Sequence, residues 1–248
     1  PLVEENHSIA FAHLSRWEGD FSSQSIGAII FSVTLIKLLE GIFTDEMDLL
    51  GDNFYKSWIG PVGAKGNWGI PLRNLRGLMA TGGSSWVDDI KTPNHIENLD
   101  EIIRLSFKAG VTELTKLLGP SPSGWWWGRL HTLTHSHSIG SAKPFLDRFF
   151  GFNVGRFESG GSSTTINNGE YSLSAPFTRV VGPSFRRIVD ISKMDNSYFV
   201  LPTGQSGLHK SPHYSDQADL YNSGQYRTTL MDETTIRNSG FRKLVLIP

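Results

Sequence analysis

The sequence predicts an α+β fold, with residues 1–118 mainly helical and residues 119–248 mainly in strands. Three observations support this division. The stretch 97–118 repeats its apolar residues with the period of a helix. The stretches 186–191 and 197–201 are rich in the β-branched and aromatic residues that favour strands. Between these regions, after Gly119-Pro120, helical periodicity gives way to a composition rich in Trp, Ser, Thr and Gly.

The N-terminal half is expected to contain several helices. The stretch 10–17 is the end of a first helix, closed near Gly19. Ser22 or Ser23 then caps a second, core-packing helix, whose apolar face contains Ile26, Ile29, Ile30, Val33, Ile36 and Leu39. Thr44, followed by two acidic residues, is expected to start another helix. The clearest helix is 97–118, which Asn98 or Asp100 can cap and Gly119-Pro120 ends.

Residues 60–83 are predicted to form a loop because glycines stand at 60, 63, 66 and 69. A phosphate-binding loop would need a preceding strand and a GK[ST] helix start, and neither is present. The next distinctive element is 86–89, which ends in the acidic pair Asp88-Asp89. Paired carboxylates can bind Ca²⁺ or share a proton. The more ordinary interpretation, which we favour, is hydrogen bonding in a loop and at a helix end.

A strand is predicted over 125–137, and it brings the best metal candidate. Alternate residues of a strand point to the same side, so His131, His135 and His137 share one face with Leu133. Two of these imidazoles could reach one ion, but a site needs a third ligand and supporting hydrogen bonds that the sequence does not reveal. We therefore expect ordinary hydrogen-bonded or partly exposed histidines, and assign no metal ligand.

The C-terminal third is organised around the stretch 182–224. Two strands, 186–191 and 197–201, flank a turn at Asp195-Asn196, and a Gly-rich turn follows at 202–207. Ser211 is expected to cap a short helix that Pro212 begins. A last helix to about Arg237 and a final strand, 241–247, complete the prediction.

Composition excludes several classes of protein. The net charge is −1 with mixed signs, so there is no basic stripe for nucleic acid. No apolar run reaches the length that we expect of a membrane span, and there is no cysteine for a disulfide or a thiolate metal site. The N-terminus lacks a signal-peptide pattern and an initiator Met, which suggests that the chain begins within a longer precursor or after a cleavage.

Several stretches, taken together, resemble the C-terminal part of the catalytic β chain of the penicillin acylase family. The stretch 182–224 reads GPSFRRIVDIS, DNSYFVLPTGQSG and SPHYSDQADLYNSG, close to that family's GPSxR-x-x-VD, PGQSG and SPHYxDQ order. Further similarities are an LxxWDG-like element at 14–20, a W-x-D-D element at 86–89, a W-G-x-x-H element at 127–131 and a Gly-rich loop at 156–171. Thr203, His135, Ser138 and the pair Ser162-Ser163 depart from the usual family residues.

The resemblance implies a layered sandwich of helices and mostly antiparallel sheets, of the N-terminal nucleophile hydrolase type, of which this chain is only the C-terminal part. It also implies an amide hydrolase that cleaves an acyl group from an amine, as in penicillins, related β-lactams or acyl-homoserine lactones. The nucleophile of such enzymes is the N-terminal residue of the second chain, usually Ser, exposed by self-cleavage, and its own α-amino group is the base.

Pro1 has no hydroxyl, so no catalytic, cofactor-binding or metal-binding residue is assigned to this chain. The resemblance places the oxyanion Asn and the Ca²⁺ site upstream. It implies as partners the α chain and the N-terminal part of the β chain of the same precursor, a small acyl-amide substrate, and a periplasmic or secreted location.

Two other interpretations remain open. Ser206 lies in a near miss to the G-x-S-x-G pattern of serine hydrolases, with His209 or His213 as base and Asp216 to orient it. Alternatively, the chain is a stand-alone β-rich binding module, for example for carbohydrate, which presents the aromatic run 125–127 to its ligand.

Overall fold

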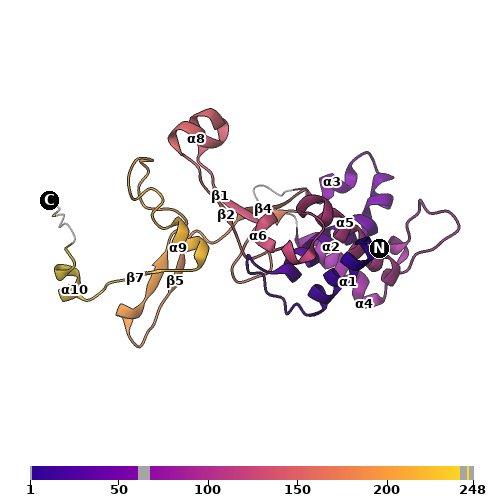
Figure 1. Cartoon of the computed structure of the whole chain (residues 1–248), viewed down its shortest axis with the longest axis horizontal. Coiled ribbons are helices and arrows are strands. Elements are labelled where there is room, and N and C mark those ends of the chain that lie inside the picture. Colours follow the sequence, from indigo (N-terminus) through magenta and orange to yellow (C-terminus); the bar gives the residue numbers. More distant parts are fainter. Residues whose placement is uncertain (1, 61–67, 241–244, 246–248) are drawn as a thin grey trace. The chain divides into compact units, whose positions relative to one another are not determined.

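The computed structural model describes residues 2–60, 68–240 and 245, and it contains helices and sheets (Figure 1). The chain forms two compact units. Unit 1 comprises Pro1–Leu133 and Phe157–Gly182, and unit 2 comprises Thr134–Arg156 and Pro183–Pro248. The chain therefore crosses between the units three times, and each unit contains helices and strands.

Unit 1 begins with α1 (Leu2–Ser15), as predicted, and Gly19 follows it with a φ of +86°. The next helix, α2 (Ile26–Asp48), differs from the prediction at both ends. Its cap is Ser25, whose hydroxyl accepts from Ala28 N, because Ser22 is instead hydrogen-bonded to Asp20. The separate helix expected at Thr44 does not exist, since α2 continues without interruption to Asp48.

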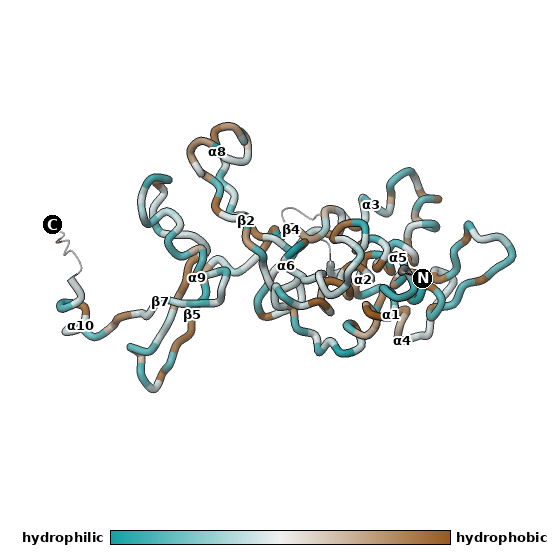
Figure 2. The backbone as a smooth tube through the Cα atoms, viewed as in Figure 1, coloured by the Kyte–Doolittle hydropathy of each residue, from teal (hydrophilic) through white to brown (hydrophobic). Residues whose placement is uncertain are grey.

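Helix α2 is the centre of the unit 1 core. By length and composition alone it is apolar enough to cross a membrane, so the prediction that no apolar run reaches that length was wrong (Figure 2). However, 61% of its most apolar window is buried inside the protein, as in the core helix of a folded domain. Its fully buried residues include Ala28, Ile29, Ile30, Leu39 and Ile42.

After α2 the chain forms α3 (Phe54–Trp58), α4 (Gly69–Thr81) and the 3₁₀ turn η1 (Ser85–Val87). The loop predicted for 60–83 is therefore wrong over 69–81, and residues 61–67 lie outside the described part. Only Gly77 interrupts the interior of α4, while Leu72, Leu75 and Leu78 recur every three residues and pack against the core. The helix ends at Gly82 in the left-handed conformation.

Helix α5 (Leu99–Leu118) confirms the strongest helix prediction. Asn98 caps it in a complete capping box with Glu101, and Gly119 follows its last residue. It packs along α2 at close range: a Cβ added to Gly110 would lie 3.1 Å from Thr34 Oγ1. Ile102, Val111 and Leu114 face the core from this helix.

The strand predicted for 125–137 is shorter than expected. The structure instead forms η2 (Pro122–Gly124), α6 (Trp127–Leu130) and then β1 (Thr132–His135). The other strands of its sheet are β2 (Val154–Glu158), β3 (Glu170–Ser172) and β4 (Ala175–Val181), in the order β2-β1-β4-β3. β3 and β4 are antiparallel, whereas β1 runs parallel to β4 with Thr132 opposite Thr178, an exception to the expected antiparallel arrangement.

Unit 2 contains the helices α7 (Ser138–Ala142) and α8 (Pro144–Phe150) and an antiparallel sheet of β5 (Arg186–Ile188), β6 (Tyr198–Val200) and β7 (Arg227–Thr228). The two strands predicted around Asp195 are thus present but shorter, with η3 (Met194–Asn196) between them. The helix expected at Ser211 begins later, as α9 (Ala218–Ser223), because Ser211 Oγ accepts from His213 N in a turn. α10 (Glu233–Asn238) matches the last predicted helix, and the final strand 241–247 falls almost entirely outside the described residues.

Candidate functional site

Three motif segments of unit 1 meet at one backbone junction. Gly128 N donates to Ser23 O at 2.7 Å, and Gly161 N donates to Phe21 O at 2.7 Å. The indole of Trp127 donates to Gly161 O at 2.9 Å. A Cβ on Gly160 would lie 2.8 Å from Phe21 O. The glycines of the 127–131 element and of the Gly-rich loop are therefore fixed by close backbone contact with the segment after Gly19.

His131 lies at the centre of this junction and is fully buried. Its ring stacks on Trp127, with centroids 4.5 Å apart, and its Nδ1 is 2.8 Å from Phe177 O. A carbonyl oxygen only accepts, so Nδ1 carries the proton in the neutral ring. Burial is the main cause that lowers the pKa of His131 to about 4; the charge of nearby Arg179 acts in the same direction, whereas the carbonyls of Phe177 and Gly160 act against it. The imidazole is therefore neutral at pH 7.

Arg179 is the buried cation of the junction, and the sequence did not reveal it. Its guanidinium donates to Ser159 Oγ at 2.8 Å and to Asn168 O at 2.6 Å. It thereby ties strand β4 to both ends of the Gly-rich loop. An isolated arginine within a strand of mixed composition has no pattern that distinguishes it from an exposed one, so burial alone identifies it.

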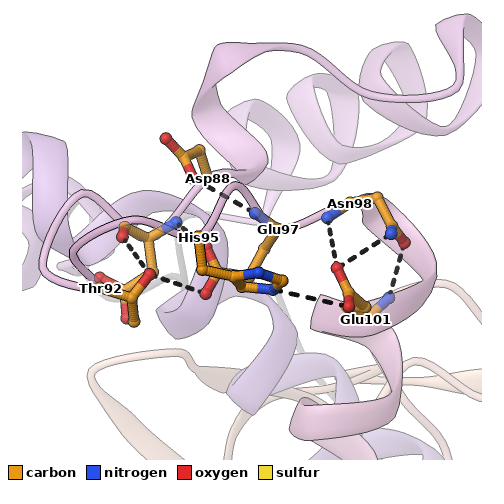
Figure 3. A network of polar contacts seen from close by, with 7 residues as sticks. Asp88, Thr92, His95, Glu97, Asn98 and Glu101 are labelled. Carbon is orange, nitrogen blue, oxygen red and sulfur yellow. Dashed lines mark hydrogen bonds and ion pairs between the residues drawn. The ribbon is translucent and has the colours of Figure 1, made fainter.

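The predicted acidic pair Asp88-Asp89 belongs to a loop network (Figure 3). Asp88 Oδ1 accepts from Glu97 N at 3.2 Å, and Glu97 Oε2 accepts from Asp89 N at 3.0 Å. Thr92 Oγ1 donates to Glu97 Oε1 at 2.8 Å, and this bond is the main cause that lowers the pKa of Glu97. These carboxylates hold the loop that precedes α5, which confirms the hydrogen-bonding interpretation of the pair.

Glu46, near the C-terminal end of α2, is an unusual carboxyl. Burial, followed by a side-chain hydrogen bond with Asp45, raises its pKa to about 7. Asp45 itself accepts from Ile90 N at 2.9 Å, which connects α2 to the 88–97 loop. Within the described part of the chain, no group of three or more His, Cys, Asp or Glu side chains is placed to hold a metal ion, this pair included.

The three histidines considered for a metal have separate roles. His131 is part of the buried junction, His135 lies edge-on to Tyr221, and His137 caps α7 by accepting from Ile139 N. The strand ends at His135, so the alternation that would align His137 with the other two does not continue. The geometry gives each ring its own partner.

The turn 202–207 in unit 2 packs against the segment 211–217. Ser206 N donates to His213 O at 3.0 Å, and Ser206 Oγ accepts from Leu208 N at 3.1 Å. Gly204 is the tightly placed glycine, since an added Cβ would lie 2.0 Å from His213 O. Gly207 has open space around it and no positive φ, so neither sterics nor backbone conformation requires a glycine there.

His213 and Asp216 form the one close pair of the proposed Ser206 triad. His213 Nδ1 is 3.0 Å from Asp216 Oδ2, and Arg227 also reaches that oxygen, at 2.8 Å. The hydrogen bond from His213, followed by the charge of Arg227, lowers the pKa of Asp216. Ser206 Oγ is engaged with the backbone two residues later, which is a local turn bond and not a nucleophile–base contact.

The aromatic run 125–127 does not form an exposed platform. Trp125 and Trp127 are fully buried, and Trp126 donates to Glu158 Oε2 at 2.9 Å. The feature that suggested a sugar-binding module is thus part of the core and its margin.

Comparisons with known proteins define the class. The family model described as penicillin amidase matches residues 2–238. Acyl-homoserine lactone acylase QuiP of Pseudomonas syringae pv. tomato is 31% identical over 252 residues, covering 100% of this chain and 29% of that protein. The protein of the same name from Pseudomonas aeruginosa is 26% identical, covering 96% of this chain and 29% of its own length.

Among solved structures, a thermostable penicillin G acylase from Alcaligenes faecalis matches with a TM-score of 0.51 at 17% identity, covering 98% of this chain and 43% of that chain. The fold is therefore the mixed α+β fold of penicillin acylases, which are N-terminal nucleophile hydrolases. The chain belongs to the penicillin amidase family. It spans less than a third of the length of the curated relatives that it matches.

Proposed function

We propose that this chain is the C-terminal segment of an amide hydrolase that releases an acyl group from an amine. One observation supports this most directly: the whole chain aligns with relatives named acyl-homoserine lactone acylases, yet it covers only 29% of the first of them. On this proposal the remaining length supplies the nucleophile, and this segment alone is inactive.

The chemistry on this proposal follows the family. An N-terminal serine of the preceding segment, exposed by self-cleavage, attacks the amide carbonyl, and its own α-amino group takes the proton. Donors of that segment stabilise the oxyanion. The Ca²⁺ of the family is assigned to the same upstream segment, and the protein is proposed to act in the periplasm or outside the cell.

The contribution of this segment is proposed to be structural. The glycine junction and the buried pair of His131 and Arg179 fix the order in which strands and loops pack. The local bonds of Ser206 leave its hydroxyl in a turn, which supports a structural role for that residue as well. The acyl group and the amine are not specified by these contacts.

The test compares the purified chain with the complete assembly. N-acyl-homoserine lactones and phenylacetyl amides should show no turnover with the chain alone, and turnover should appear when the preceding part of the precursor is produced with it. In the complete enzyme, Ser206→Ala should keep most of kcat and cost about 1 kcal/mol of stability, typical of one lost hydrogen bond.

Two results would contradict this proposal. One is turnover by the verified single chain. The other is a loss of a thousandfold or more in kcat for Ser206→Ala with an unchanged melting temperature, which would place the nucleophile in this chain.

A further inference from the structure

Helix α8 in unit 2 presents aromatic side chains to solvent, and Figure 2 shows much of its backbone in brown. Phe145 and Phe149 are 77% and 78% exposed, and Phe150 is 42% exposed. Since Phe145 and Phe149 are four residues apart, they lie on the same side of the helix. Leu208, which is 74% exposed, precedes His209, whose ring contacts Phe150. We call Phe145, Phe149 and Phe150 the α8 patch.

The α8 patch stands on an ordered base within unit 2. The carboxylate of Asp147 accepts from Asn153 N at 2.7 Å and from Asn153 Nδ2 at 3.0 Å. Asn153 Oδ1 in turn accepts from His137 N at 2.7 Å. Phe152 packs against the ring of His209, with centroids 4.9 Å apart. These contacts hold α8 in place, so the patch is formed before a partner arrives and binding orders few further groups.

The segments that carry the patch and its base are basic. Three of their exposed side chains are cations that make no ion pair with any residue that the structure describes: Lys143, Arg148 and Lys210. Asp147, which Asn153 already engages, is the only acidic residue within 136–156 and 200–215. The next acid along the chain, Asp216, is paired with Arg227. A surface that covers the patch should therefore be apolar at its centre and acidic at its rim.

Exposed apolar patches of this kind usually bind a partner, and charge and length favour one occupant here. A second copy of this chain would bring the same basic rim, so like charges would oppose each other across a symmetric contact. The chain covers only 29% of the first acylase relative, so most of the length of that protein lies outside the matched part. A surface of the same protein is present at a high effective concentration, which favours it over a partner from solution.

We propose that the α8 patch is a docking surface for the remainder of the same protein, and that it binds an apolar element rimmed by Asp and Glu side chains. This inference rests on the proposed function, in which this chain is one segment of a longer enzyme. On docking, Phe145 and Phe149 are buried against apolar side chains, while Lys143 and Arg148 pair with the carboxylates of the rim. The patch is thus covered in the complete enzyme and exposed in the isolated chain.

The chain contains no cysteine, so one introduced thiol reports the exposure of one position. Phe149→Cys is labelled with a maleimide in the isolated chain and in the complete enzyme, and mass spectrometry quantifies the labelled peptide. We expect labelling to be slower by about a hundredfold or more in the complete enzyme, since a covered thiol reacts only during local opening. The control is Lys193→Cys, at an exposed polar position between β5 and β6, which should react at similar rates in both.

Charge reversal tests the acidic rim of the partner surface. In the complete enzyme, Lys143→Glu combined with Arg148→Glu should speed labelling at position 149 by about tenfold or more, because like charges then oppose each other across the contact. The charge-conserving pair Lys143→Arg and Arg148→Lys should keep the protection. Circular dichroism establishes that each variant is folded. Protection that is unchanged by charge reversal in a folded enzyme would overturn the assignment of an acidic partner surface.

The remaining outcomes distinguish the possible occupants. Equal labelling of position 149 in the isolated chain and in the complete enzyme would overturn the proposal. So would protection that appears only with vesicles of phosphatidylglycerol, which would assign the patch to a membrane, or protection that grows with the concentration of the isolated chain, which would assign it to a second copy. Protection in a complete enzyme without amide turnover would refute the proposed function and leave the docking surface standing.

Discussion

Acidification should destabilise unit 1 through His131. The ring is neutral in the folded protein because its pKa is lowered to about 4 from 6.5. Burial disfavours the charged form of the ring, so the pKa of His131 is lower in the folded protein than in the unfolded chain. The stability that depends on the neutral ring is therefore fully present above pH 6.5, the pKa in the unfolded chain. It is then lost as the pH falls from 6.5 towards 4, because the unfolded chain takes up the proton first.

The magnitude follows from the shift. One pKa unit corresponds to about 1.4 kcal/mol, so the difference between 6.5 and about 4 gives about 3 kcal/mol of lost stability. Such a loss would lower the melting temperature by roughly 6–12 °C in a domain of 150–250 residues. The burial of His131, its stacking on Trp127 and its bond to Phe177 O are the features on which this value rests.

The assay is urea unfolding between pH 4 and pH 8, followed by tryptophan fluorescence. All seven tryptophans, Trp17 to Trp127, lie in unit 1, so the signal reports that unit. His131→Gln removes the titrating group and keeps a donor for Phe177 O. The variant is expected to be less stable at pH 7, because it loses the stack on Trp127, but its stability should change by about 3 kcal/mol less between pH 7 and pH 4. Parallel curves for the two proteins would refute the buried-histidine argument.

Two further predictions concern other parts of the chain. Glu46 has a raised pKa, so its stabilising contribution is present below pH 4.5 and is lost as the pH rises through about 7. Glu46→Gln should therefore raise the melting temperature at pH 8 and not at pH 4. An equal change of melting temperature at both pH values would refute this prediction. In unit 2, Gly204→Ala should lower the stability by on the order of 3 kcal/mol because the added Cβ meets His213 O, whereas Gly207→Ala should lower it by less than about 1 kcal/mol. Hydrogen exchange of peptides within 198–217 measures the difference. Equally fast exchange in both variants would contradict it.

Local sequence signals predicted the elements whose stability is local. Neighbouring residues determine the capping box of Asn98 and Glu101, the helical period of α5 and the two strands around Asp195. The predictions failed where a distant contact decides the outcome. Thr44 has the composition of a helix start, but it lies inside α2, where Ile42, Phe43 and Met47 around it are buried in the core and Asp45 accepts from the distant Ile90 N.

Glycine-rich composition misled in a similar way. The spacing of glycines predicts a loop that includes Gly69, whereas the leucines after it pack on the core and stabilise α4. In the turn 202–207, sequence identified two glycines but not which of them is constrained. The answer depends on His213 O, which approaches Gly204 from the following segment. The buried position of Arg179 had no sequence signal, since it results from packing of distant segments.

The motifs that indicated the family are mainly positions of close backbone approach. A Cβ on Gly27 would lie 2.2 Å from the ring of Trp17, and one on Gly161 would lie 2.0 Å from Asn167 O. Both are distances that real Cβ atoms do not show, so a larger residue would force the motif segments apart. Two other glycines lie against side chains of the junction: an added Cβ would lie 2.9 Å from His131 Nε2 at Gly169 and 2.1 Å from Arg179 Nη2 at Gly182. These close contacts specify packing, which is why a segment can keep its family motifs while the proposed chemistry depends on another part of the enzyme.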